Sequence, residues 1–171
     1  GDRIRIGEHN FECISGYGHA PEHMALHCAA RGILISGDMV LPRISTNISV
    51  FAGEPEADPL KLFLTSLKRF DSLADSTLVL PSHGKPFVGL AERLQQLHAH
   101  HQDHLAVARS ACTEKAQSAG ELLPQLFRRE LDTQQLSFAL GEALAHLHLL
   151  WHEGVVNRVC EPDGVYRFRT T

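Results

Sequence analysis

The sequence lacks any long hydrophobic run. No apolar stretch approaches the roughly 18 residues that a membrane-spanning helix needs, and no charged-then-apolar leader opens the chain. The four cysteines form no Cys-x-x-Cys pair, and the formal net charge is −4 with the histidines neutral. These absences argue against a membrane span and a strongly basic nucleic-acid surface, and they predict a cytoplasmic protein with reduced thiols.

Histidine, by contrast, is abundant. Twelve of the 171 residues are histidines, in a chain whose hydrophobic fraction of 43% is otherwise ordinary for a globular protein. Neutral imidazole is the commonest metal ligand in proteins. The positions of the histidines therefore direct the search for function.

Alternating hydrophobicity predicts short strands in the first half of the chain. The expected strands cover residues 3–7, 11–15, 24–29, 32–36 and 78–80, with a turn at 8–10. Apolar residues at helical spacing predict an amphipathic helix over 58–73. We therefore expect antiparallel strands with one helix packed against them.

The second half of the chain is predicted to be helical. A long helix is expected over 90–112, and Ser118 with Glu121 forms a capping-box pattern for a short helix to 127, which Pro124 would delay or kink. Asp132 is expected to cap a third helix over 133–152 that Gly154 closes. Strands at 155–160 and 165–168 would then pair around an Asp-Gly turn. Three helices and a two-stranded wing follow the order of a winged helix, so we expect domains at 1–97 and 98–171.

Three of the predicted strands end next to a side chain that can bind metal. These side chains are His19 in "GHAPEH", Asp38 in "ILISGD" and His83 in "LPSHG". Loops that follow strands hold side chains at fixed spacing, and histidine nitrogen and carboxylate oxygen both suit Zn²⁺. Each motif alone is also typical of an ordinary hydrogen-bonded turn. Their order and spacing together favour a shared site.

In this order the three motifs resemble the second half of the metallo-β-lactamase superfamily, and the whole chain is similar to its lactamase-like hydrolases with a C-terminal winged helix. That subgroup includes endoribonuclease-like and hydroxyacylglutathione-hydrolase-like members. The resemblance implies an α+β fold: the C-terminal half of the αββα sandwich, followed by a helical winged-helix domain. It also implies a hydrolase.

The resemblance also implies roles for four residues. His19 would ligate one zinc ion, Asp38 would bridge two ions and act in catalysis, and His83 would ligate the second. His23 would stand beside the metals as a catalytic hydrogen-bonding group, unless it only caps its turn. Iron or manganese could replace zinc, since both accept such ligands.

The loop 41–49, "LPRISTNIS", follows the bridging aspartate and would line the substrate cleft. Arg43 could bind an anionic group, Asn47 could hydrogen-bond an oxyanion, and Ser45 lies between them. The alternative is a polar loop whose side chains satisfy only its own backbone.

The superfamily's first metal motif, His-x-His-x-Asp-His, occurs nowhere in the sequence. The similar-looking "HAHHQDH" at 98–104 lies inside a helical pattern. His100 with His104, and His148 with His152, have i,i+4 spacing and could each share a metal, but exposed polar helix faces are the better interpretation.

We therefore expect the C-terminal part of a larger hydrolase. Metal binding by this part alone should be weak or absent, because two-metal chemistry needs both ions held. One face of its sheet should be uncovered, which a second copy of the chain could cover in a homodimer.

The predicted function is hydrolysis of ester, thioester or lactone carbonyls of small molecules by a metal-bridged hydroxide, with this part alone inactive. A metal-dependent endoribonuclease and a non-catalytic binding module are the alternatives. Residues 98–171 carry seven Lys and Arg against nine Asp and Glu, and 133–152 contain neither Lys nor Arg. This charge balance favours small-molecule substrates over nucleic acid.

Overall fold

The computed structural model describes residues 1–171, which divide into two compact units. The sheet unit comprises residues 1–46 and 62–98, and the helical unit comprises residues 47–61 and 99–171. The segment 47–61 therefore groups with the C-terminal helices, although it lies in the first half of the sequence. None of the helices is both long and apolar enough to cross a membrane.

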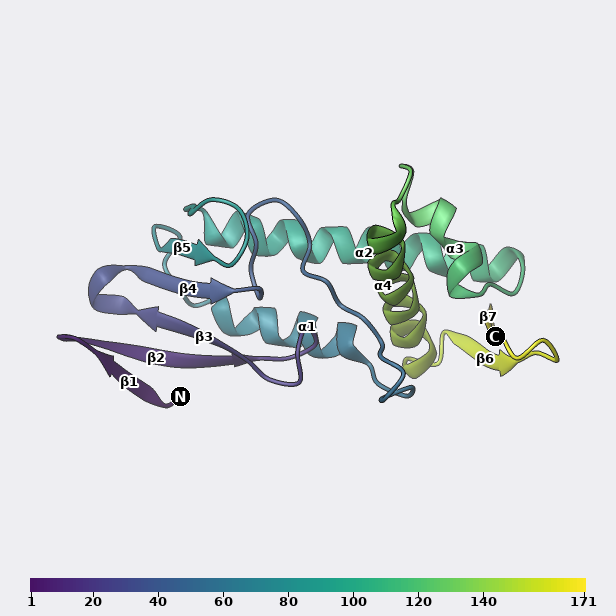
Figure 1. Cartoon of the computed structure of the whole chain (residues 1–171), viewed down its shortest axis with the longest axis horizontal. Helices are drawn as coiled ribbons and strands as arrows, with labels where there is room; N and C mark the ends of the chain where they lie inside the picture. The colour runs from purple at the N-terminus through teal and green to yellow at the C-terminus, as the bar shows by residue number, and fades with distance from the viewer. The chain divides into compact units, whose positions relative to one another are not determined.

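The sheet unit is built on five strands in sequence order (Figure 1). They are β1 (Arg3–Ile6), β2 (His9–Gly16), β3 (His23–Cys28), β4 (Ile33–Gly37) and β5 (Leu78–Pro81). The five predicted strands are thus confirmed to within three residues at each end. The first turn is tighter than expected, because Ile6 pairs directly with His9 and only Gly7 and Glu8 lie between the strands.

The predicted all-antiparallel arrangement is wrong at the last strand. β1 to β4 pair antiparallel, but β5 pairs with β4 in parallel. A parallel neighbour needs a long crossover connection, and here the connection contains helix α1 (Pro59–Leu67) and the 3₁₀ turn η2 (Lys68–Phe70). The predicted helix over 58–73 is therefore shorter than expected and tightens in its last turn.

The two faces of the sheet differ in burial. Ile14, Ala25, Leu34 and Val79 share one face through the strand register and are buried, and the buried Phe63, Leu67 and Phe70 complete the core of the unit. Residues of the opposite face remain exposed although they are apolar, namely Ile4, Ile6, Met24, Ile35 and Leu78, with exposed fractions of 37–47%. The apolar sheet face, as we call this second set, is large for a solvated surface.

The helical unit contains the second part of α2 (Leu90–Glu114), together with α3 (Ala119–Leu126), α4 (Thr133–His152), β6 (Val156–Cys160) and β7 (Tyr166–Thr170). Both predicted caps are present. Ser118 and Glu121 form a reciprocal capping box, and Asp132 accepts a hydrogen bond of 2.8 Å from the backbone N–H of Gln135. Despite Pro124, α3 begins directly after its cap.

The C-terminal strands form the predicted antiparallel hairpin, which is anchored through β7. Phe168 is fully buried, and its backbone exchanges two hydrogen bonds, of 2.8 and 2.9 Å, with that of Gln117. The buried side chain of Phe168 and its two backbone hydrogen bonds to Gln117 therefore join the hairpin to the core of the helical unit.

The expectation of exposed helix faces is confirmed for His152 and wrong for His148, which is buried, while His100 and His104 are half-buried. His101 and His146, which that expectation did not cover, are fully buried. His148 Nδ1 lies 2.9 Å from the carbonyl oxygen of Ala57, and His152 Nε2 lies 2.9 Å from that of Glu56. The imidazoles of His148 and His152 thus contact backbone carbonyl groups of segment 47–61, which belongs to the same unit.

Truncating the core face of the sheet should destabilise the protein. We expect Leu34→Ala to lower the free energy of unfolding by about 2–5 kcal/mol, because it leaves a cavity at a fully buried position of the core. Leu78→Ala on the neighbouring strand is the matched control, and it should cost less than about 1 kcal/mol because Leu78 is 38% exposed. Urea denaturation measures both, and equal losses would contradict the assignment of the faces.

Candidate functional site

Three strands end at the same edge of the sheet. β2 and β4 both run antiparallel to β3, and β5 runs parallel to β4, so all three point in one direction. The loops after Gly16, Gly37 and Pro81 therefore emerge together. They carry His19, Asp38 and His83, which lie far apart in the sequence.

The three predicted ligands do converge. His19 Nε2 lies 3.7 Å from Asp38 Oδ2, and His83 Nε2 lies 3.5 Å from Asp38 Oδ1. Asp38 thus presents one carboxylate oxygen to each imidazole. Its side chain is 26% exposed and that of His83 is 69% exposed, so the group opens to solvent.

The donor set fits zinc. Ligand atoms on a tetrahedral Zn²⁺, each about 2.1 Å from the metal, lie about 3.4 Å from one another. The two separations around Asp38 are close to this value, and a carboxylate with an imidazole on each oxygen can serve two cations. The residues present would supply part of a two-metal centre.

His23 has a different position from the other two histidines. Its Nε2 accepts a hydrogen bond of 3.2 Å from the backbone N–H of Asp38, and its Nδ1 is buried without a hydrogen-bond partner. Burial, followed by the nearby His19, lowers the pKa of His23 against the opposing effect of Asp38. A neutral His23 with Nδ1 protonated can accept this bond, so His23 orients the turn that carries Asp38.

The turn after β4 is held from several sides. Gly37 adopts a left-handed φ of 54°, and a Cβ there would collide with the imidazole of His23. The buried Ser36 hydroxyl donates to the carbonyl of Val40 at 2.8 Å, and the buried Thr46 hydroxyl donates to the carbonyl of Asp38. These contacts therefore hold the backbone that carries the Asp38 carboxylate in one conformation.

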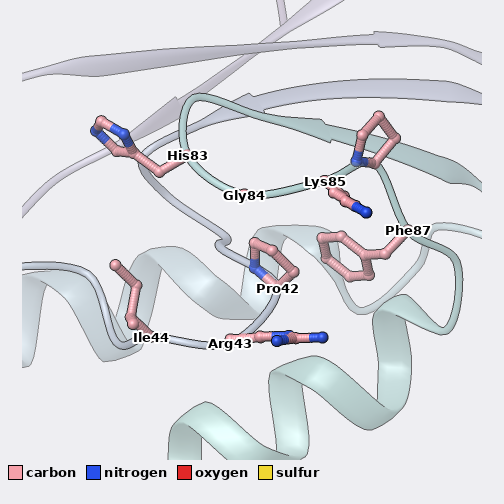
Figure 2. Close-up of a pocket in the computed structure, with 8 residues that line it drawn as sticks. Pro42, Arg43, Ile44, His83, Gly84, Lys85 and Phe87 are labelled. Atoms are coloured by element: carbon pink, nitrogen blue, oxygen red, sulfur yellow. The ribbon is translucent and has the colours of Figure 1, made fainter.

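A cavity of about 630 Å³ lies beside His83. Figure 2 shows Arg43, Lys85 and Phe87 around this space, with His83 at one end of it. Two cationic side chains next to an aromatic ring suit a small anionic molecule with an apolar part. Lys85 was not singled out from the sequence, although it directly follows "SHG".

The other two predicted substrate residues do not line this cavity. Ser45 is half-buried outside it, and Asn47 belongs to the helical unit, where its Oδ1 accepts a hydrogen bond of 3.0 Å from Ser49. Arg93 of α2, which sequence reasoning missed, holds the cavity loop instead. Its guanidinium donates to the carbonyls of Leu41 and Ile44 at 2.6 and 2.8 Å, and no sequence motif marks it for this task.

Comparison with known proteins gives matches along the whole chain. Residues 105–171 match the family model described as "Metallo-beta-lactamase-like, C-terminal domain". A curated relative, the probable metallo-hydrolase YqjP of Bacillus subtilis, is 28% identical over 156 residues, which are 90% of this chain and 48% of that protein.

Two solved structures cover all of this chain. A beta-lactamase domain protein from Burkholderia ambifaria is 57% identical with a TM-score of 0.98, and half of its chain is covered. The metallo-beta-lactamase family protein TTHA1429 from Thermus thermophilus is 32% identical with a TM-score of 0.85, and 52% of its chain is covered. The chain thus spans about half the length of the relatives it matches.

The support of Asp38 can be tested with two glycine substitutions. Gly37→Ala should weaken Zn²⁺ binding at His19 and His83 about 10-fold or more, since the new methyl group displaces His23 and with it the Asp38 turn. Imidazole NMR shifts during a zinc titration measure this.

Gly32→Ala is the matched control. Gly32 has a similar φ of 60° but open space around its Cβ position, so this variant should lose only about 1–2 kcal/mol of stability through strain. Equal zinc affinity of the two variants would show that His23 does not orient Asp38.

Proposed function

Because the chain belongs to the metallo-β-lactamase superfamily, we propose that it supplies half of the active site of a binuclear metal-dependent hydrolase. His19, Asp38 and His83 would hold the metal ions, most suitably zinc. The single observation that carries the proposal is the carboxylate of Asp38, which faces one imidazole through each of its oxygens at 3.7 and 3.5 Å.

Bound zinc would supply Lewis-acid activation of water and of the attacked carbonyl group. The chain's own residues do the positioning. His23 holds the backbone of Asp38, Thr46 fixes the same turn from its carbonyl side, and Arg93 holds the cavity loop in place. Such rigid support keeps ligands within the narrow range of geometry that a two-metal site tolerates.

We propose small anionic esters, thioesters or lactones as substrates. Arg43 and Lys85 beside the cavity would attract a carboxylate or phosphate on the substrate, while Pro42 and Phe87 would contact its apolar part. In this proposal the carbonyl to be attacked lies toward His83, at the end of the cavity nearest the metals.

The order of α2, α3, α4 and the β6–β7 hairpin supports a winged-helix domain, but its charges argue against a nuclease. Arg158 of the hairpin stacks 3.7 Å from the Trp151 ring centroid and pairs with Glu56 at 2.6 Å. Arg167 pairs with Asp163 at 2.9 Å. Two of the three arginines of the hairpin, which are Arg158, Arg167 and Arg169, are thus engaged within the unit, and α4 contains neither Lys nor Arg. The endoribonuclease and the non-catalytic module remain as alternatives.

The hydrolase proposal can be tested in a hybrid protein. The half of the Burkholderia relative that this chain covers is replaced by the chain, and the product is assayed with thioesters, esters, lactones and single-stranded RNA. We expect carbonyl hydrolysis, and Asp38→Asn should reduce kcat/KM at least 100-fold because the carboxylate serves both ions.

Asp71→Asn, which changes an exposed aspartate of the same unit, is the control and should leave activity unchanged. Cleavage of RNA that depends on Asp38 and falls steeply with salt would favour the nuclease instead. A hybrid that folds, binds zinc and hydrolyses none of these substrates would favour the non-catalytic module.

For the chain by itself, we propose that a second copy covers the apolar sheet face. Ile35→Glu and Met24→Glu should then turn a dimer into a monomer in sedimentation experiments, because each places a charge among exposed apolar side chains. Val88→Glu is the control, since Val88 is 63% exposed and lies outside the strands. A wild-type monomer at micromolar concentration would refute the pairing.

A further inference from the structure

A second group of histidines gathers around one carboxylate inside the helical unit. His100 and His104 lie one turn apart on α2, and both face Glu142 of α4. His100 Nε2 is 3.3 Å and His104 Nδ1 is 3.5 Å from the same oxygen, Glu142 Oε1. We call these three residues the α2–α4 cluster.

The spacing of the α2–α4 cluster suits a metal ion. Three ligand atoms, one from each residue, lie within 4.8 Å of one another, and the two measured separations are close to the roughly 3.4 Å between ligands of tetrahedral Zn²⁺. His104 Nδ1 is buried and has no hydrogen-bond partner, and it lies 3.5 Å from Glu142 Oε1. A buried polar atom without a partner, directed at a carboxylate, is what a cation bound at this place would explain.

The charge of the cluster also calls for a cation. The Glu142 side chain is only 12% exposed, and its ion-pair partners are imidazoles, with no Lys or Arg among them. A carboxylate so shielded from water is costly to bury in its charged form without a counter-charge, and a cation bound between it and the two imidazoles would supply one.

Two further histidines lie next to the cluster, and both already have hydrogen-bond partners. His101 Nδ1 and His146 Nε2 lie 3.2 Å apart, and His146 Nδ1 lies 2.7 Å from the backbone carbonyl oxygen of Glu142. These contacts hold the backbone of the α4 turn that carries Glu142.

We propose that His100, His104 and Glu142 form a binding site for a divalent transition metal, with Zn²⁺ the ion that fits it best. Two imidazoles and a carboxylate are a common zinc ligand set, and helices that face each other often carry such sites. His100 is 36% exposed, which gives the ion an entry path and leaves its fourth position to water. Bound zinc joins α2 to α4 within the helical unit and stabilises that unit.

The site can be separated from the centre at the sheet edge by mutation. A background variant of the full chain, Asp38→Ala with His83→Ala, removes ligands of that centre. We expect this variant to bind one Zn²⁺ per chain in isothermal titration, and to give the visible absorption of tetrahedral Co²⁺ when cobalt is used. Zinc should also raise its thermal unfolding temperature.

Adding Glu142→Gln to the background should weaken Zn²⁺ binding at least 100-fold and abolish the rise in unfolding temperature. His100→Ala is a second test in case Glu142→Gln fails to fold, since its side chain is the most exposed of the three. His152→Ala, which changes an exposed histidine on the same helix α4, is the matched control and should leave the Zn²⁺ affinity and the zinc-induced rise in unfolding temperature unchanged.

The proposal is wrong if the background variant binds no Zn²⁺ at micromolar concentration. It is equally wrong if a folded Glu142→Gln or His100→Ala variant binds zinc as tightly as the background. Neither result bears on the sheet-edge centre, whose ligands the background already lacks.

Discussion

The common direction of β2, β4 and β5 is the constraint on which the candidate metal centre depends. The loops after these strands reach one edge of the sheet only because β5 joins parallel to β4. An antiparallel β5 would send His83 to the opposite edge, about four residues of strand away. Asp38 would then have an imidazole on one oxygen alone, and the chemistry of two ions sharing a carboxylate would be lost.

Both of the metal sites that we propose place a carboxylate between two imidazoles, in different surroundings. At the sheet edge the group opens to solvent, which would suit a site that admits a substrate, and His23 and Thr46 hold the backbone of the Asp38 turn. In the helical unit the carboxylate of Glu142 is shielded by the helices that carry the cluster, which suits a structural ion better than catalysis.

The apolar sheet face is energetically unfavourable when it is exposed to water. Exposed side chains such as Ile6 and Met24 form part of a surface that water does not favour, and the buried face opposite is already filled by Phe63 and its neighbours. The relatives are about twice as long as this chain. The proposed pairing with a second copy of the chain would remove this face from water.

The sequence by itself determined the local structure and the ligand types. Period-2 and helical patterns, the Ser118 capping box, the Asp132 cap and the Asp-Gly turn all act over a few residues, so they could be located in the sequence and are present. The motifs around His19, Asp38 and His83 likewise stood next to predicted strand ends.

Only the tertiary structure decided what those side chains meet. The parallel pairing of β5, the support of the cavity loop by Arg93, the placement of Asn47 in the helical unit and the burial of His101 and His146 all join residues that are distant in sequence. Local patterns carry no information on such contacts, because one helix pattern fits a solvated polar face and a buried histidine network alike. The contacts between α2 and α4 around Glu142 decide which of the two arrangements forms, and no single segment of the chain specifies these contacts.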